Sequence, residues 1–287
     1  MPQTDIQAVI LLTNDIECDK FILLTIGVIA MDTQGKRYAI FLDIDGTLLR
    51  NSKQALQKNI DVIQKVRSLG HKVLINTGRS TAYMPKEFDA IKYFDGIISG
   101  AGARIILDKK ELFCKLMPDT AIRHFFEICF DTKDVSIFEG VDEMYIVGPA
   151  RPFEYDWQFI TPENVESYIK SGMRIEKFTI LGKAPEELQN VLGNDYIVLQ
   201  HPTYAEVIQK AYTKAGAMRI VLDYLKIPSE QSIAVGDSLN DYDMISAAGI
   251  GVAMGNAIPE IKEIASIITS SVDEAGVAAV LEKIFNV

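Results

Sequence analysis

The side chains with the clearest chemical potential stand at the end of an apolar run. Residues 39–42 (AIFL) are followed at once by Asp43, Asp45 and Gly46. A short apolar run is typical of a strand buried in a parallel sheet, and ligands bind beyond the carboxyl ends of such strands. If strand geometry continues, Asp43 and Asp45 project to the same side, where their charges need a cation between them or a proton on one. The alternative interpretation is an ordinary Asp-Gly turn.

Polar residues also follow two other apolar runs, and one lysine begins a predicted helix. They are Thr77, Gly78 and Arg79 after residues 71–76, then Asp237, Asn240 and Asp241 after residues 232–235, and Lys214 at the start of residues 214–225. The carboxyl ends of parallel strands lie at one edge of a sheet, so these side chains can converge. The set contains neither a Ser-His-Asp nor a Cys-His arrangement, and it lacks a Walker-type loop.

The types of these residues indicate phosphoryl chemistry. Several aspartates with oxygen ligands suit Mg²⁺. A metal and a lysine beside a hydroxyl and free backbone N–H groups suit a phosphoryl group. One carboxylate can attack phosphorus to give an aspartyl-phosphate, and a second can protonate the leaving oxygen and then activate water. The residues alone leave open which aspartate attacks.

Strands and helices alternate along most of the chain, which predicts an α/β fold. After the first strand we expect a helix over 59–69, a strand over 71–76, a helix over 80–88, a strand over 96–99 and a hairpin of 104–107 with 112–116. Units of this kind indicate a right-handed parallel sheet. The same pattern resumes after Thr213.

The order of the predicted helices and strands changes at Pro118. Between there and residue 210 we expect helices over 119–130, 162–171 and 185–192 and strands over 135–138, 144–147, 174–181, 196–200 and 205–209. This mixture predicts an inserted α+β domain with an antiparallel sheet and helices on one face. The predicted division is therefore an extension at 1–37, a core of 38–117 and 211–287, and an inserted domain at 118–210.

The N-terminal extension has no role that the sequence defines. Its apolar run, residues 21–31, is eleven residues long, whereas a membrane span needs roughly 20. The charged residues before Met31 are four acidic residues and one lysine, so the segment lacks the basic start of a signal peptide. We expect the functional domain to start near Met31.

Composition favours a soluble globular protein of the cytoplasm. The 287 residues are 48% hydrophobic and 24% charged, and the net charge of −10 argues against nucleic acid or an anionic membrane as the partner. The three cysteines, Cys18, Cys114 and Cys129, lack metal-binding or redox spacing, which suits a reducing compartment.

As an ordered set, the motifs resemble those of the haloacid dehalogenase superfamily of phosphatases, and most closely its Cof-like branch. The matching segments are FLDIDGTLL (41–49), INTGRS (75–80), Lys214 in YTKAGAM, VGDSLNDYDMI (235–245) and GVAMGNA (251–257). The resemblance covers residues 38–287 and implies a Rossmann-like core with an α+β cap inserted between the second and third motifs. Where the family often has Asn-Gly-Ala after the third strand, this chain has Ser99-Gly100-Ala101.

The resemblance implies which residues carry the reaction. Asp43 would be the nucleophile and a Mg²⁺ ligand. Asp45 would be the general acid and base, with its backbone carbonyl on the metal. Lys214 would neutralise the charge of Asp43 and of the phosphate.

It also implies residues that bind phosphate and metal. Thr77 and the backbone of Gly78 would hold the phosphoryl oxygens, with Asn240 as a further phosphate ligand. Asp237 would ligate Mg²⁺, and Asp241 would orient the metal-bound waters.

The predicted function is a Mg²⁺-dependent phosphatase of small phosphorylated metabolites, sugar phosphates first, with flavin mononucleotide or pyridoxal phosphate as further candidates. The alternatives are a sugar phosphomutase and a non-catalytic regulatory protein that binds a phosphorylated metabolite. Candidates for substrate contacts are Arg79 and, in and near the cap, Arg104, Arg123, Arg151, Arg174, Lys177, His201 and Glu206. Trp157 is interpreted as a packing residue. The sequence does not define an oligomeric state.

Overall fold

The chain forms two sheets, each with its own helices. The computed structural model describes residues 35–50, 53–85, 90–132, 135–148, 157–186 and 188–287. The first sheet contains β1 (Ala39–Leu42), β2 (Lys72–Asn76), β3 (Gly96–Ser99), β4 (Arg104–Leu107), β5 (Lys110–Cys114), β12 (Ser232–Gly236), β13 (Ile250–Ala253) and β14 (Ile267–Ile268). Its strand order is β14-β13-β12-β1-β2-β3-β4-β5.

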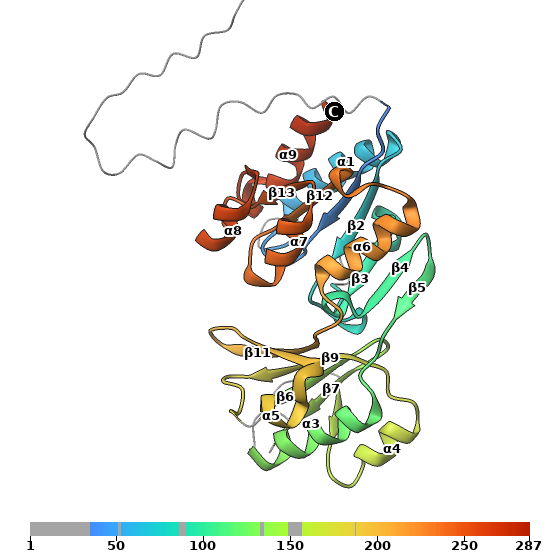
Figure 1. The fold of residues 1–287 in the computed structure, drawn as a ribbon, viewed down its shortest axis with the longest axis vertical. Coiled ribbons are helices and arrows are strands. Elements are labelled where there is room, and N and C mark those ends of the chain that lie inside the picture. The colour runs from blue at the N-terminus through green and yellow to red at the C-terminus, as the bar shows by residue number, and fades with distance from the viewer. Residues whose placement is uncertain (1–34, 51–52, 86–89, 133–134, 149–156, 187) are drawn as a thin grey trace, which may run out of the picture.

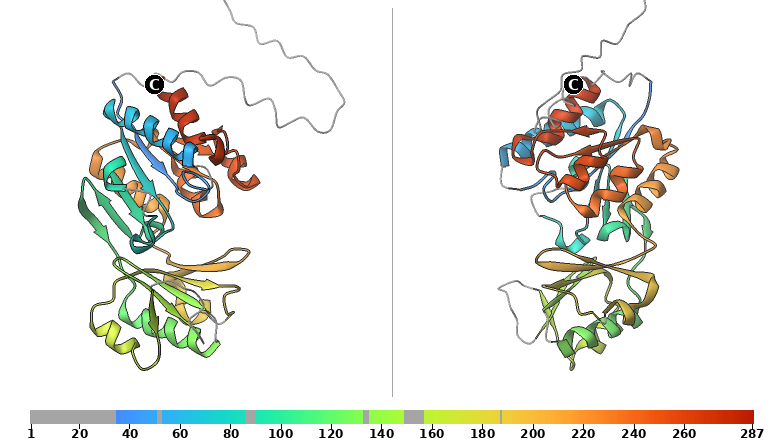
Figure 2. Two further views of the ribbon diagram at one scale, coloured as in Figure 1. Left: turned by 180° about the vertical axis from the view of Figure 1, so that it is seen from behind. Right: turned by 60° about the vertical axis from the view of Figure 1, so that its left-hand side comes forward.

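The first sheet is parallel except at one edge. The strands from β14 to β3 pair in parallel, and β4 and β5 add an antiparallel hairpin. Its helices are α1 (Lys53–Ser68), α2 (Ala90–Tyr93), α6 (Lys214–Leu225), α7 (Tyr242–Ala247), α8 (Pro259–Ile264) and α9 (Gly276–Phe285). Figures 1 and 2 show α6 and α7 on one face and α1 on the other. Because both faces are covered, all four residues of β1 are buried, which explains the unbroken apolar run in the sequence.

The second sheet lies on the side of the first where its strands end (Figure 1). It contains β6 (Ser136–Gly140), β7 (Met144–Val147), β8 (Gln158–Ile160), β9 (Ile175–Leu181), β10 (Tyr196–Gln200) and β11 (Tyr204–Gln209), in the order β10-β11-β9-β6-β7-β8. Its helices are α3 (Asp119–Thr132), α4 (Val165–Lys170) and α5 (Leu188–Leu192). Phe125 of α3 stacks on Phe178 of β9 at 4.1 Å between ring centroids, so the helices cover one face.

This architecture confirms the predicted α/β fold with a parallel core sheet, and an inserted cap is consistent with it. The exact division at residues 118 and 210 stays a prediction, as does the cytoplasmic location. Of the predicted extension, residues 1–34 lie outside the described part of the chain. Among the described helices, none combines the length and the apolar character that crossing a membrane requires.

Several details differ from the sequence-based expectation: α1 begins at Lys53 rather than at residue 59, and the short helix α2 was not predicted. In the described part of the helix predicted over 80–88, Thr81–Tyr83 form a single 3₁₀ turn, because Met84 precedes Pro85 and adopts an extended conformation (φ −65°, ψ 136°). Residues 86–88 lie outside the described part of the chain. The hairpin turn is tighter than predicted: Asp108 and Lys109 both have positive φ, so β5 begins at Lys110. The short strand β8 was not predicted, since three residues carry too little periodicity to be recognised.

Candidate active site

Five of the predicted site residues line one pocket between the two sheets. The pocket has a volume of about 340 Å³. Its lining from the first sheet and the loops that follow it includes Asp43, Asp45, Thr77, Gly78 and Asn240. These residues follow β1, β2 and β12, so the convergence expected at the carboxyl edge of the sheet is observed.

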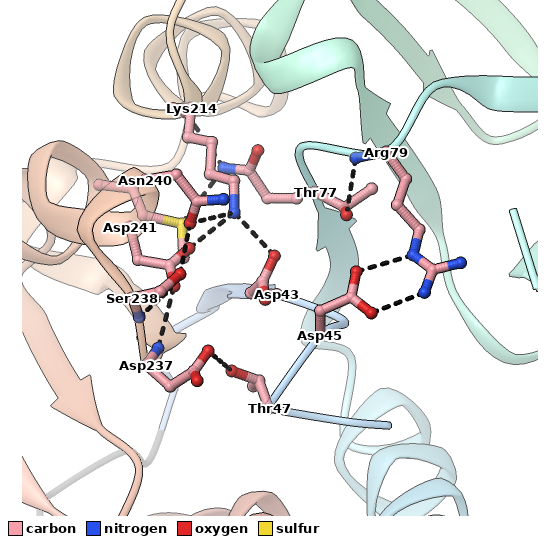
Figure 3. A network of polar contacts seen from close by, with 12 residues as sticks. Asp43, Asp45, Thr47, Thr77, Arg79, Lys214, Asp237, Ser238, Asn240 and Asp241 are labelled. Carbon is pink, nitrogen blue, oxygen red and sulfur yellow. Dashed lines mark hydrogen bonds and ion pairs between the residues drawn. The ribbon is translucent and has the colours of Figure 1, made fainter. Parts of the chain in front are cut away.

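Lys214 connects the predicted nucleophile to the acidic loop (Figure 3). Its Nζ atom lies 2.7 Å from Oδ1 of Asp43 and 2.6 Å from Oδ1 of Asp241. Thr213 caps α6 by accepting a hydrogen bond from the backbone N–H of Gly216, so the helix begins at Lys214. Burial alone would lower the pKa of the Lys214 ammonium, but the carboxylates of Asp241 and Asp43 raise it above its ordinary value. The lysine is therefore charged at neutral pH.

Three carboxylates lie around this ammonium. Asp43, Asp237 and Asp241 each offer an oxygen, and these oxygens lie within 4.8 Å of one another. Burial and the charge of Asp241 raise the pKa of Asp237 to about 7. Burial also raises the pKa of Asp43 well above its ordinary value, although Lys214 opposes this. An excess of negative charge with oxygen-only donors fits a divalent metal.

The loop geometry that holds Asp237 depends on Gly46 and Asn256. Gly46 has φ +79°, and a Cβ atom there would overlap the carboxylate of Asp237. The amide of Asn256 donates to the backbone oxygen of Gly46 at 2.8 Å and to Oδ2 of Asp237 at 3.4 Å. Asn256 stands in the segment GVAMGNA, but no role was predicted for it from the sequence. Asp241 closes its own turn as well, because Oδ2 accepts the backbone N–H of Asp237 at 2.9 Å.

Asp45 lies outside the cluster of three carboxylates that contains Asp43. β1 ends at Leu42, and the carboxylate of Asp45 is held by Arg79, whose Nε and Nη2 donate to its two oxygens at 2.7 and 2.6 Å (Figure 3). Both residues nevertheless line the same pocket, as expected if their carboxylates share one side. The acidic cluster consists of Asp43, Asp237 and Asp241, and a contribution from the backbone carbonyl of Asp45 stays a prediction.

The predicted phosphate ligands lie next to each other. The hydroxyl of Thr77 is buried and accepts the backbone N–H of Arg79 at 3.1 Å. A Cβ atom on Gly78 would lie 3.4 Å from Nδ2 of Asn240 and 3.5 Å from Oε1 of Glu206. Gly78 is thus the point where the first sheet's loops, Asn240 and the second sheet approach one another.

The second sheet supplies the other wall of the pocket. Of the candidates in and near the cap, Lys177 and Glu206 line the pocket, and His201 lies 3.1 Å from Glu206. Sequence reasoning missed Glu139 and Thr179, which also line it. The remaining arginines form ion pairs away from the pocket lining: Arg104 with Glu111, Arg123 with Glu166, and Arg174 with Glu111 and Asp142. Arg151 lies outside the described residues.

Two aromatic residues complete the rim. Trp157 packs edge-on against Tyr83, with ring centroids 5.8 Å apart, and both line the pocket. The guanidinium of Arg79 lies over the Tyr83 ring, 4.8 Å from its centroid. Trp157 thus packs, as expected, but it does so at the pocket rim, across the boundary between the two sheets.

Glu176 joins β9 to the first sheet through a buried carboxylate. It accepts hydrogen bonds from the backbone N–H of Thr81 at 3.0 Å, from the Thr81 hydroxyl at 2.7 Å and from the Ser99 hydroxyl at 3.1 Å. Ser99 is the residue that departs from the family's usual Asn. Burial raises the pKa of Glu176 to about 7, and these hydrogen bonds only partly oppose the shift.

The raised pKa of Glu176 predicts a pH-dependent stability. Between its ordinary value of 4.5 and about 7, the folded state binds a proton that the unfolded state has lost, so stability falls as pH rises. In Glu176→Gln, we expect the slope of unfolding free energy against pH in this window to flatten by up to about 1.4 kcal/mol per unit. Urea unfolding at about pH 5, 6 and 7 measures it, with exposed Glu186→Gln as the control. Parallel slopes for Glu176→Gln and the wild type would show that Glu176 titrates normally.

Comparisons with known proteins show the family to which the chain belongs. A family model described as haloacid dehalogenase-like hydrolase matches residues 40–281. The 5-amino-6-(5-phospho-D-ribitylamino)uracil phosphatase YitU of Bacillus subtilis (strain 168) is 28% identical over 267 residues, covering 88% of this chain and 98% of that protein. Phosphatase YwpJ of the same organism is 28% identical over 280 residues, covering 85% and 98%.

Two solved structures share the whole architecture. One, from a study of phosphatases of the HAD superfamily, comes from Bacteroides thetaiotaomicron; it is 25% identical, covers 91% of this chain and 99% of its own, and has a TM-score of 0.76. The other is a HAD subclass IIB sugar phosphatase, also 25% identical, which covers 87% of this chain and 99% of its own with a TM-score of 0.72.

Proposed function

The chain belongs to the haloacid dehalogenase-like hydrolases and is a phosphatase, and we propose that it hydrolyses small phosphorylated metabolites, sugar phosphates first, with Mg²⁺ and through an aspartyl-phosphate on Asp43. The observation that carries this proposal is the buried carboxylate of Asp43, held 2.7 Å from Lys214 at a pocket that Thr77, Gly78 and Asn240 also line. Nucleophile, countercharge and oxygen-binding groups are thus assembled at one place.

The proposed first step transfers the phosphoryl group to the protein. A carboxylate oxygen of Asp43 attacks phosphorus in line, and the bond from phosphorus to the ester oxygen breaks. Asp45 gives its proton to the departing oxygen, which leaves as an alcohol. Meanwhile the Thr77 hydroxyl, the Gly78 N–H and the Asn240 amide hold the phosphoryl oxygens, and Lys214 offsets their charge.

The proposed second step regenerates Asp43. Asp45, now a carboxylate, accepts a proton from a water molecule, and the hydroxide attacks phosphorus. The bond to the Asp43 oxygen breaks and inorganic phosphate is released. Arg79 holds Asp45 at the pocket rim, and the wall formed by the second sheet limits the access of bulk water.

The acidic cluster is the place for the metal. Asp43, Asp237 and Asp241 would hold Mg²⁺ together with the backbone carbonyl of Asp45. When bound, the ion supplies positive charge that offsets the aspartates and the phosphoryl oxygens.

The size of the pocket and the named relatives favour a small substrate. A volume of about 340 Å³ is at the lower end of ordinary small-molecule sites. The relatives include a sugar phosphatase and a phosphatase named for a phosphoribityl compound, and a phosphate ester of a sugar or sugar-like chain is common to both names.

A phosphate-release assay tests the function and its alternatives. We expect hydrolysis of 4-nitrophenyl phosphate and of a panel of sugar phosphates with Mg²⁺, falling by at least about 100-fold after chelation and recovering when Mg²⁺ returns. Conversion of a sugar phosphate into an isomeric sugar phosphate, without release of inorganic phosphate, would favour the phosphomutase. No reaction with any divalent metal would favour the non-catalytic binding protein and overturn the proposal.

A further inference from the structure

Four polar side chains cover one face of the second sheet, opposite the helices. We call Glu139, Lys177, Thr179 and Glu206 the polar face. Glu139 of β6 pairs in register with Lys177 of β9, and Thr179 of β9 pairs with Glu206 of β11. Because side chains alternate along strands, the four project together toward the pocket, which all of them line.

The residues next to the polar face on the same strands point to the opposite side of the sheet, and both sides are buried. Phe138, Phe178 and Val207 are the sequence neighbours of the polar face, and they are buried in the apolar cluster with α3. Figure 1 shows α3, α4 and α5 on that side of the sheet and the first sheet on the other. The polar face is nevertheless buried as well, with Lys177 4% and Glu206 5% exposed.

Lys177 and Glu206 are both ionised. The ammonium of Lys177 donates a hydrogen bond to Oε1 of Glu206 and lies 3.3 Å from Oε1 of Glu139. Burial alone would raise the pKa of Glu206, but Lys177 and His201 hold it at about 2. Burial would lower the pKa of Lys177, and the two glutamates raise it instead. Each of these charges therefore already has its partner.

Glu139 differs from them because one of its two carboxylate oxygens has no partner in the described part of the chain. Oε1 accepts the hydroxyl of Thr179 at 2.6 Å and faces Lys177. Oε2 is buried and finds no hydrogen-bond donor among the described residues, on a side chain that lines the pocket and belongs to a residue 5% exposed. A buried acceptor without a hydrogen bond is unfavourable. A hydrogen-bond donor on a ligand in the pocket would therefore be stabilised by this oxygen.

The charge of the polar face restricts which donor fits. The carboxylates of Glu139 and Glu206 face a single ammonium, that of Lys177. Oε1 of Glu206 also lies close to the predicted phosphate ligands, 3.5 Å from where a Cβ atom on Gly78 would be. A hydroxyl can donate to Glu139 there. A second phosphate or a carboxylate is mostly deprotonated at neutral pH, and its negative charge would be repelled by the two glutamates.

We propose that Oε2 of Glu139 accepts a hydrogen bond from a hydroxyl of the leaving group, which selects monophosphate esters of polyhydroxylated alcohols and rejects esters with a second anionic group. This inference rests on the proposed phosphatase function and adds its substrate class. Glu139 is then a specificity residue that touches the substrate away from the phosphorus.

The wild-type protein tests the selection directly. With Mg²⁺, we expect kcat/KM for glucitol 6-phosphate to exceed that for hexyl phosphate by at least about tenfold, because one hydrogen bond to a buried charged acceptor is worth that factor or more. We expect a similar preference for fructose 6-phosphate over fructose 1,6-bisphosphate. Equal values within about twofold in both pairs would overturn the inference.

Glu139→Gln ties the selection to this residue. The amide keeps the shape but loses the charge, so the preference for glucitol 6-phosphate over hexyl phosphate should fall about tenfold. Glu186→Gln, on an exposed glutamate shortly before α5, is the matched control and should keep the wild-type ratio. If Glu139→Gln kept the wild-type ratio of kcat/KM for glucitol 6-phosphate to that for hexyl phosphate, other residues would make the selection and the inference would be contradicted. If this variant does not fold, as circular dichroism would show, the two wild-type pairs decide alone.

The two proposals fail in different ways. Hydrolysis of 4-nitrophenyl phosphate without either preference would leave the proposed function standing and refute the role of Glu139. Absence of hydrolysis with every ester and metal would refute both.

Discussion

Asp43→Asn is expected to lower kcat for every phosphate ester by at least about 10⁴-fold. The amide nitrogen and oxygen occupy the positions of the two carboxylate oxygens but cannot form a stable acyl-phosphate. Asp43 is 3% exposed and lies 2.7 Å from Lys214, so neighbouring groups cannot easily replace it. Steady-state phosphate release with Mg²⁺ measures the effect.

The fold should survive this change, which separates a catalytic role from a structural one. Burial already disfavours the charged form of Asp43, as its raised pKa shows, and Lys214 keeps Asp241 as a partner at 2.6 Å. We expect a thermal unfolding curve close to that of the wild type. Asp61→Asn, on an exposed aspartate of α1, is the control and should keep full activity.

A second variant distinguishes the two aspartates. In Asp45→Asn the aspartyl-phosphate should form with a good leaving group such as 4-nitrophenol and then persist, because no base activates water. Intact mass spectrometry should detect the added phosphoryl group in Asp45→Asn and not in Asp43→Asn. An Asp43→Asn protein with metal-dependent turnover would contradict the assignment of the nucleophile.

The parts of the site that could be predicted are those in which the site residues directly follow an apolar strand in the sequence. A strand buried on both faces must be apolar throughout, and its polar successors must lie at the sheet edge, so the sequence alone could place Asp43, Thr77 and Asp237 together. The partner of the Asp45 carboxylate could not be predicted in this way. Gly46 turns the chain, and Asp45 meets Arg79, a partner 34 positions away that no periodicity connects to it.

The substrate side of the pocket was less predictable for the same physical reason. Glu139, Lys177 and Glu206 sit on three strands whose order in the sheet is set by long-range pairing. Each has an apolar residue next to it in the strand, a pattern that also describes ordinary solvent-exposed strand positions. Burial of the polar face follows only from the placement of the second sheet against the first, which the sequence of either sheet alone does not contain.

Lys214→Met is expected to lower the unfolding free energy by about 3–5 kcal/mol in the presence of a chelator. Lys214 is 1% exposed and is the ammonium between Asp43 and Asp241, with Asp237 nearby. Methionine fills similar space without the charge, and it leaves the buried carboxylates without this cation. Urea unfolding measures the loss, and phosphate release should fall with it because the phosphoryl charge is no longer offset.

Added Mg²⁺ should return part of this stability, because an ion in the acidic cluster replaces some of the missing positive charge. Lys183→Met is the matched control: Lys183 is 78% exposed and pairs with Glu186 three positions along the chain, so a change within about 0.5 kcal/mol is expected, with no response to Mg²⁺ beyond that of the wild type. If Lys214→Met were as stable as the wild type without metal, the carboxylates would have to be protonated in the folded protein. In that case Lys214 would not be the countercharge on which the proposed attack by Asp43 depends.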